Sequence, residues 1–177
     1  MKAVIIYESM YGNTRTIADA IAEGLRPDEA IVIPVAQARP ELLDGAGLLV
    51  VGGPTHIHGM SRASTRRGAA LAAGKPQSGL MMLPGAEGPG LREWLAALGR
   101  VDGPAAAFDT RLEMPAVFTG RASSGIARLL RQHGCTMVTK PVSFLVTKDN
   151  RLRAGEDSRA RDWGQLLSGI LAARIPA

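Results

Sequence analysis

The sequence predicts an α/β protein with a doubly wound, five-stranded parallel sheet and helices on both faces. Three observations lead to this fold class. Short apolar runs rich in β-branched residues alternate with amphipathic helical segments along most of the chain. The third run shows no polar alternation, as is typical of a parallel strand buried on both faces. Polar loops follow the first, third and fourth runs, and in a parallel sheet such loops open on one edge.

Five apolar segments are the predicted strands, at residues 3–7, 30–35, 47–53, 105–108 and 136–139 continued by 142–146. Pro34 lies in the second strand, and Pro141 interrupts the fifth. Because proline cannot donate to a ladder of backbone hydrogen bonds, both strands are expected at the edges of the sheet.

Helices are predicted at residues 13–25, 64–73, 91–98, 123–134 and 156–173, with a short helical turn at 40–43. In the closing helix Trp163, Leu167 and Ile170 recur at helical spacing and form one apolar side. Residues 74–90 are rich in glycine and proline and have little periodicity. We expect them to form a surface excursion within the domain.

The totals indicate one globular domain, residues 1–177, with 46% hydrophobic and 21% charged residues. No apolar run approaches transmembrane length, and the N-terminus shows no signal-peptide pattern. The single cysteine, Cys135, excludes an internal disulfide framework and is expected to be a buried structural thiol. A cytoplasmic protein without membrane insertion is therefore expected.

The charge is basic, with 21 Lys and Arg against 16 Asp and Glu and a sequence pI near 10.0. Only 4% of residues are aromatic, and no standard nucleic-acid-binding motif is present, so no nucleic-acid partner is expected. We attribute the excess to solvated basic faces. Attraction of an anionic partner or substrate by Arg62, Arg66 and Arg67 is the alternative.

The first strand leads through a loop of hydroxyls and glycine directly into a helix. The first amides of a helix lack internal partners and carry partial positive charge, so this geometry suits a phosphate. Ser9 and Thr14 add hydroxyl donors, and Gly12 permits close approach. The loop lacks the lysine of triphosphate-binding loops and the spacing of dinucleotide folds, which favours the monoester of a cofactor. An ordinary strand–turn–helix connection capped by Asn13 is the alternative.

The loop Ser9-Met10-Tyr11-Gly12-Asn13-Thr14 after a first strand resembles the FMN phosphate loop of flavodoxins and flavodoxin-like quinone reductases. The resemblance extends over essentially the whole chain and implies strand order 2-1-3-4-5 with FMN as cofactor. It implies phosphate binding by the first loop and contacts of the second and third loops with the isoalloxazine ring. The implied cofactor-binding residues are Ser9, Met10, Tyr11, Gly12, Asn13, Thr14, Pro54, Thr55, His56, Ile57, His58, Gly59, Asp109, Thr110 and Arg111.

Two features depart from the family's pattern. Flavodoxins commonly stack aromatic residues on the ring, whereas the second loop here offers only His56 and His58, and the third offers no aromatic after Phe108. The family is also usually acidic at this edge, and this chain is basic. The His56-x-His58 pair lacks a third ligand nearby, so no metal site is predicted. By the resemblance, the His58–Gly59 peptide could rotate to offer its carbonyl to the flavin.

The expected function is FMN-dependent electron transfer between a reductase and an acceptor protein, with no catalytic residue of its own. One alternative is a flavodoxin-fold NAD(P)H:quinone reductase or porphyrinogen-oxidase-like enzyme, with residues 74–90 covering a substrate pocket beside the ring. A second alternative is a flavin-free regulatory or binding domain, which the missing aromatics would favour.

Overall fold

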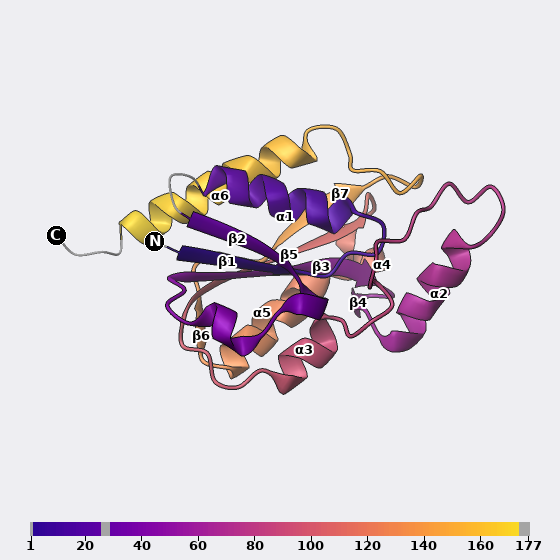
Figure 1. Cartoon of the computed structure of the whole chain (residues 1–177). Helices are drawn as coiled ribbons and strands as arrows, with labels where there is room; N and C mark the ends of the chain where they lie inside the picture. The colour runs from indigo at the N-terminus through magenta and orange to yellow at the C-terminus, as the bar shows by residue number, and fades with distance from the viewer. Residues whose placement is uncertain (1, 26–28, 174–177) are drawn as a thin grey trace.

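A computed structural model describes residues 2–25 and 29–173 of the chain (Figure 1). Its strands are β1 (Lys2–Tyr7), β2 (Glu29–Pro34), β3 (Leu48–His56), β4 (Gly59–Met60), β5 (Gly103–Leu112), β6 (Cys135–Met137) and β7 (Val142–Val146). Its α-helices are α1 (Asn13–Gly24), α2 (Ala63–Ala73), α3 (Leu91–Ala97), α4 (Ala116–Thr119), α5 (Ala122–Gln132) and α6 (Glu156–Ala172). Two 3-10 turns, η1 (Val35–Gln37) and η2 (Pro40–Leu43), follow β2.

The sheet order β2-β1-β3-β5-β6 confirms the predicted order 2-1-3-4-5. The predicted fifth strand is present as two pieces, β6 and β7, which pair in parallel with successive parts of β5. The interruption coincides with Pro141, and β2 with Pro34 lies at the other edge, as proline's missing donor requires. The sheet also includes β4, a two-residue strand antiparallel to the end of β3.

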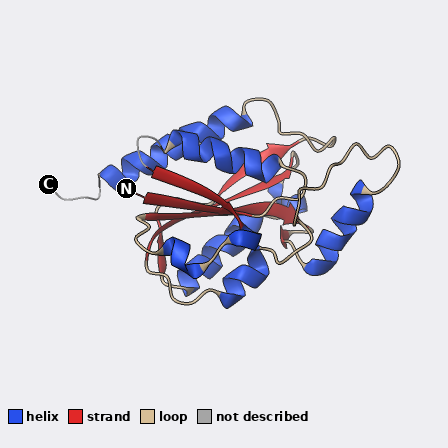
Figure 2. Ribbon diagram, in the orientation of Figure 1, coloured by secondary structure: helices blue, strands red, loops and turns tan. Residues whose placement is uncertain are grey.

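Helices cover both faces of the sheet, with α1 and α6 on one side and α3 and α5 on the other (Figures 1 and 2). Because side chains alternate along a strand, each strand contributes to two separate cores. In β1, Ile5 points to the core shared with α1 and α6, whereas Val4 and Ile6 point to the core shared with α3 and α5. Burial on both faces explains the unbroken apolar runs of the sequence.

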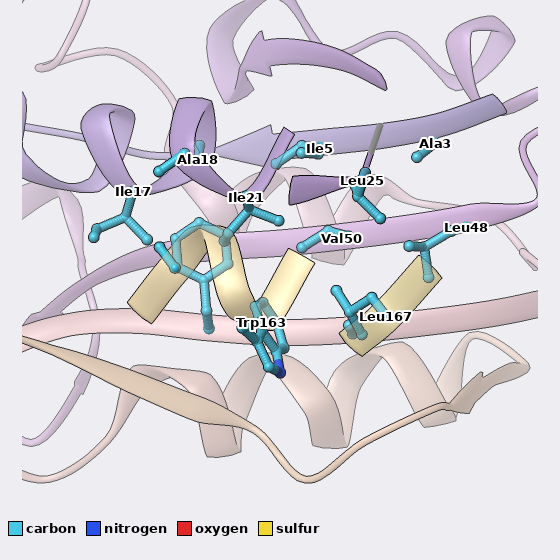
Figure 3. Packing of buried hydrophobic residues seen from close by; sticks show 14 of the residues in the cluster. Ala3, Ile5, Ile17, Ala18, Ile21, Leu25, Leu48, Val50, Trp163 and Leu167 are labelled. Atoms are coloured by element: carbon cyan, nitrogen blue, oxygen red, sulfur yellow. The ribbon is translucent and has the colours of Figure 1, made fainter. Parts of the chain in front are cut away.

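In the first core, α1 and α6 pack closely enough to exclude a side chain at their crossing. A Cβ on Gly164 would lie 2.3 Å from the backbone oxygen of Ile21, so this position requires glycine. Next to the crossing, Trp163 packs edge-on against Phe108 and Phe144, with ring centroids 6.3 and 6.2 Å away. Figure 3 shows the aliphatic residues around Trp163.

Two strands run further than the sequence analysis predicted. β3 continues to His56 and β5 to Leu112, so residues 54–56 and 109–111 belong to strands and not to loops. The continued pairing explains the difference: Pro54 is still paired with Thr110, and β5 keeps β7 as a neighbour through Leu112. The backbone of the polar residues at these positions is therefore fixed by strand pairing at the carboxyl edge of the sheet.

Helix α2 and the segment 74–90 lie outside the layered body (Figure 1). The segment contains no helix or strand, which confirms the predicted surface excursion. It is attached to the first loop where the N–H of Leu83 donates to the backbone oxygen of Met10 at 2.8 Å. Cys135 is 6% exposed, which confirms the expected buried thiol. None of the helices in the described ranges is both long and apolar enough to cross a lipid bilayer.

Candidate functional site at the carboxyl edge of the sheet

The loop between β1 and α1 carries a group of neighbouring backbone N–H donors. Gly12 adopts φ 101° at the N-cap of α1, a conformation open to glycine at little cost. Its N–H donates to Ser9 Oγ at 3.1 Å, which folds the loop back on itself. Within the described chain, no protein acceptor is recorded for five neighbouring backbone N–H groups. These belong to Met10, Tyr11, Asn13, Thr14 and Arg15.

Side chains of the same loop fasten it to three other parts of the molecule. Tyr11 donates its hydroxyl hydrogen to the backbone oxygen of Ala69 in α2, at 2.8 Å. Asn13 Nδ2 donates to the backbone oxygen of Asn150 at 3.0 Å. The Thr14 hydroxyl lies 2.8 Å from that of Thr110 in β5. The loop is therefore fixed in place by contacts with three other parts of the molecule.

A cleft opens beside this loop, between the ends of β3 and β5 and the turn after β7. Ten of the fifteen predicted residues line it. They are Ser9, Met10, Tyr11, Asn13, Thr14, Pro54, Thr55, His56, Thr110 and Arg111. Ile57 and His58 line an adjoining depression, together with Thr55 and Arg111. Residues from the first, third and fourth predicted strands thus converge at one place.

The second predicted loop is a two-residue hairpin between β3 and β4. Its central residues, Ile57 and His58, have φ values of 43° and 68°, both in the left-handed region. Positive φ at both centres is the requirement of the tight hairpin turn, normally met by glycine or asparagine. A β-branched residue such as Ile57 is strained there, and Ile57 is also 82% exposed. Such strain is found most often at functional sites.

Gly59, in contrast, is in β4 with φ outside the left-handed region. A Cβ built on Gly59 would meet no atom within 4 Å. The conformation shown therefore does not require glycine at this position, and the unusual backbone is that of Ile57 and His58.

The third predicted segment divides between the two faces of the sheet. Thr110 and Arg111 line the cleft, but Asp109 is 0% exposed and its Oδ2 accepts a 2.7 Å hydrogen bond from the N–H of Ser123 in α5. Burial raises the pKa of the Asp109 carboxyl above its usual range, although the Ser123 hydrogen bond acts against it. Asp109 caps helix α5 through this hydrogen bond, and its expected contact with a flavin ring stays a prediction.

Arg111 holds the segment that follows β5. One of its terminal nitrogens donates to the backbone oxygens of Leu112, at 3.2 Å, and Met114, at 2.5 Å. Its Nε is buried and has no acceptor among the described residues. Arg111 thus keeps one buried donor without a protein acceptor among the described residues, and it does not pair with Asp109.

The hairpin turn and the segment after β5 touch each other. Gly120, at φ 71°, packs directly on the backbone of His58, and a Cβ there would lie 2.2 Å from the His58 oxygen. Thr55 Oγ1 accepts the N–H of Ala122 at 2.9 Å, which fastens the start of α5 to β3. Phe118, 64% exposed in α4, lines the depression between the two elements.

Phe118 was missed by the sequence analysis, which found no aromatic in this region. The available signal was the run of Met114, Val117 and Phe118 between the end of an apolar strand and Gly120. Large apolar residues in a loop are exposed unless a partner or ligand covers them, so such a run marks a candidate contact site.

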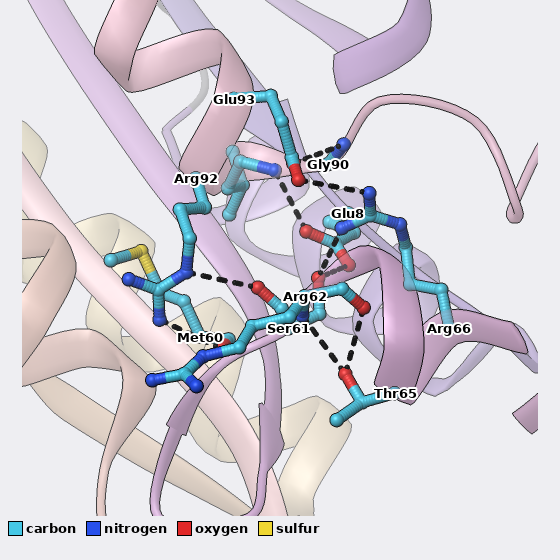
Figure 4. A network of polar contacts seen from close by, with 10 residues as sticks. Glu8, Met60, Ser61, Arg62, Thr65, Arg66, Gly90, Arg92 and Glu93 are labelled. Carbon is cyan, nitrogen blue, oxygen red and sulfur yellow. Dashed lines mark hydrogen bonds and ion pairs between the residues drawn. The ribbon is translucent and has the colours of Figure 1, made fainter. Parts of the chain in front are cut away.

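A buried charged network lies behind the first two loops (Figure 4). The Glu8 carboxylate is 4% exposed and accepts from the hydroxyl of Ser61 and, at 2.8 Å, from the N–H of Leu91. Arg66, 2% exposed, donates to Ser61 Oγ at 3.0 Å and to Glu93 Oε1 at 3.1 Å. Arg66 is therefore a structural residue, and the idea that it attracts an anionic partner is wrong.

The network ties together segments that must be in register for the cleft to exist. Glu8 directly precedes the first loop, and Ser61 directly follows the hairpin. Arg92 adds bonds from α3 to the backbone oxygens of Ser61 and Met60, at 3.2 and 3.1 Å. Nothing in the sequence pattern linked these residues, because hydrogen bonds between distant segments leave no periodic signal.

His56 ends β3 and His58 lies in the hairpin turn, and the two line different depressions. Burial lowers the pKa of His56, with Glu8 acting to raise it, so this imidazole is neutral at pH 7. In the described residues there is no group of three His, Cys, Asp or Glu side chains that could hold a metal ion.

The donor set of the cleft fits a flavin phosphate. The free backbone amides of the first loop are neutral donors, and the Nε of Arg111 belongs to a cation. Neither has a protein acceptor among the described residues. A phosphate would satisfy the amides. Fold and site together define a doubly wound protein with a loop of unbonded backbone amides at the switch between its first and third strands, the place where such sheets bind their ligands.

Comparison with known proteins agrees with this definition. The family model described as Flavodoxin matches residues 5–99, and the chain belongs to the flavodoxin family, whose members bind flavin, generally FMN. A flavodoxin from the domain Archaea has TM-score 0.65 and 19% identity, with 97% of this chain and 99% of that chain covered. Flavodoxin 1 from Bacillus cereus has TM-score 0.64 and 18% identity, with coverage of 99% and 100%. A flavodoxin, WrbA-like protein from Agrobacterium tumefaciens has TM-score 0.61 and 18% identity, with coverage of 98% and 99%.

Proposed function

We propose that the chain binds FMN at the carboxyl edge of its sheet and transfers electrons between a reductase and an acceptor protein. The observation that carries this proposal is the row of free backbone donors from Met10 to Arg15. When bound there, the flavin would supply the redox chemistry, taking up and releasing electrons one or two at a time. The protein's residues would bind and orient it.

Each loop has a part in this proposal. The amides of the first loop and the Thr14 hydroxyl would hold the phosphate, with Thr110 keeping Thr14 in place. The hairpin with Ile57 and His58 would flank one side of the ring, and Arg111 with Phe118 the other. Phe118 would supply the apolar ring contact that the second loop lacks.

Flavin titration of the purified protein tests the phosphate site. FMN should bind with a dissociation constant at or below the micromolar range, as measured by quenching of flavin fluorescence. Riboflavin, which lacks the phosphate, should bind at least about a hundredfold more weakly, since several charge-assisted hydrogen bonds are lost. Equal affinities for FMN and riboflavin would contradict the assignment of the loop.

A pair of threonine variants localises the effect. Thr14→Val removes the hydroxyl of a 2%-exposed residue at the loop and should weaken FMN binding roughly tenfold or more, with little change for riboflavin. Thr16→Val is the matched control, because Thr16 is exposed and its hydroxyl contacts only the backbone oxygen of Gly12. A flavin-free regulatory domain, in contrast, would bind neither ligand at micromolar concentration.

A second candidate function is reduction of quinones by NAD(P)H. The observation that favours it is the depression beside the expected ring position, half of whose lining residues are the apolar Ile57, Leu112, Met114 and Phe118. The excursion 74–90 gives no support, because none of its residues lines this depression or the main cleft. Direct oxidation of NAD(P)H with a quinone, without an added reductase, would favour the enzyme, and activity only through a reductase would favour the carrier.

A further inference from the structure

Exposed apolar side chains are concentrated at the carboxyl edge. Eight large hydrophobic residues are exposed in the described chain, and five of them belong to this edge. We call them the apolar edge cluster: Ile57, Leu112, Met114, Val117 and Phe118. Ile57 and Val117 are 82% and 78% exposed, so no part of the described chain covers them. Four of the five, all but Val117, line the depression beside the proposed ring site.

Cations without acidic partners border this cluster. Lys148 shares two surface depressions with Leu112, and Arg151 shares one of them. Arg121 follows Gly120, whose backbone is bridged to His58 of the hairpin. Arg111 lines the depression itself and bonds only to neutral oxygens. Among the described residues, none of these four side chains forms an ion pair.

The acidic residues nearby do not balance these charges. Glu113 is paired with Arg153 at 3.1 Å, so that their charges cancel. Asp149 remains as the one unpaired carboxylate recorded in the same surface depressions. The edge thus presents four cations against one carboxylate around an apolar centre.

We propose that this surface, the apolar edge cluster with Arg111, Arg121, Lys148 and Arg151, docks an acidic protein. The pattern of an apolar centre with a charged rim is that of a transient protein interface, in which the rim guides approach and orientation. Charge complementarity selects a partner with a negative surface around its own redox centre. A second copy of this chain would bring the same positive rim, and like charges would oppose the pairing. That the partner is a redox protein rests on the proposed function.

Binding of two surrogate redox proteins of opposite charge tests the proposal. The probes are an acidic [2Fe–2S] ferredoxin and a basic c-type cytochrome, each titrated into the isotope-labelled protein and followed by nuclear magnetic resonance. The ferredoxin should shift the amide signals of the hairpin, α4 and residues 147–151, with an affinity that falls roughly tenfold or more between 20 and 300 mM salt. The cytochrome should bind at least tenfold more weakly at low salt.

Charge-reversal variants locate the contact. Lys148→Glu with Arg151→Glu should weaken ferredoxin binding roughly tenfold at low salt. Arg39→Glu with Arg131→Glu is the matched control, because both are exposed, have no recorded ion pair and lie outside the carboxyl-edge surface. It should change the affinity less than about twofold. Phe118→Ser should weaken binding, whereas Leu166→Ser, an exposed leucine on α6, should not.

Three outcomes would overturn the proposal: tighter binding of the cytochrome, equal effects of the two charge reversals, or concentration-dependent self-association through the cluster. Displacement of the ferredoxin by a short single-stranded oligonucleotide at equal concentration would also overturn it, since this would indicate general adhesion of polyanions. The titrations are run with and without FMN. Failure to bind FMN contradicts the proposed function, whereas the signal shifts of the flavin-free protein still decide the docking surface.

Discussion

Replacing Arg66 tests whether the buried network holds the site together. Arg66→Met keeps most of the side-chain volume but removes a cation that is 2% exposed and donates to Ser61 and Glu93. The Glu8 carboxylate, 4% exposed, would then lose the buried cation that donates to its partner Ser61. Breaking a buried ionic arrangement by removing one partner costs about 3–5 kcal/mol. We expect the free energy of unfolding to fall by that amount.

The neighbouring Arg67 is the control, because it is exposed and has no recorded partner among the described residues. Arg67→Met should change the free energy of unfolding by less than about 0.5 kcal/mol. Urea denaturation followed by tryptophan fluorescence measures both variants. The double variant with Glu8→Gln should be more stable than the sum of the two single effects predicts, by at least about 1 kcal/mol, because it removes the uncompensated charge.

A cost below about 1 kcal/mol for Arg66→Met, or strict additivity with Glu8→Gln, would refute this reasoning. Either result would mean that Glu8 finds enough solvation without the arginine. FMN affinity gives an independent readout, since Glu8 directly precedes the first loop and Ser61 directly follows the hairpin. The folded fraction of Arg66→Met should bind FMN more weakly, and that of Arg67→Met should not.

Three further substitutions follow from the packing. Burial raises the pKa of the Asp109 carboxyl in the folded protein, so folding favours the protonated carboxyl. This contribution to the free energy of unfolding is fully present below the carboxyl's pKa in the unfolded chain. It is lost as the pH rises through the carboxyl's pKa in the folded protein. Asp109→Asn should therefore stabilise the protein at pH 7, by about 1 kcal/mol, and abolish that part of the pH dependence, which urea titrations from pH 4 to 8 would reveal. Gly164→Ala should lower the free energy of unfolding by about 1–3 kcal/mol, because the new Cβ would clash with α1. Gly169→Ala in the same helix has open space around its Cβ and should cause no loss of stability. Thermal denaturation measures both variants. Gly120→Ala should lower the free energy of unfolding by more than about 2 kcal/mol, because Gly120 has a φ of 71° and lies against the hairpin. Gly59→Ala should change the free energy of unfolding by less than about 0.5 kcal/mol. Similar losses of stability in the two variants would contradict this geometry.

The order of the sheet and the position of the loop between β1 and α1 could be predicted from the sequence because both depend on local patterns. Five apolar runs alternating with helices leave few topologies, and the loop before α1 carries its glycine and hydroxyls in consecutive positions. The predicted ends of two strands were wrong, because polar residues there suggested a loop although they still pair with a neighbouring strand. Asp109 to Arg111 are polar and were assigned to a loop, yet pairing with β7 extends the strand through them.

The chain by itself determined that a parallel sheet would form and that one of its loops would present free amides, since periodicity and loop composition are properties of neighbouring residues. Tertiary structure alone decided which polar residues face the cleft. It turned Asp109 away to cap α5, buried Arg66 with Glu8, and brought Phe118 beside Ile57. The physical reason is that these positions depend on strand register and on hydrogen bonds between segments far apart in the chain, and neither leaves a signal in the order of neighbouring residues.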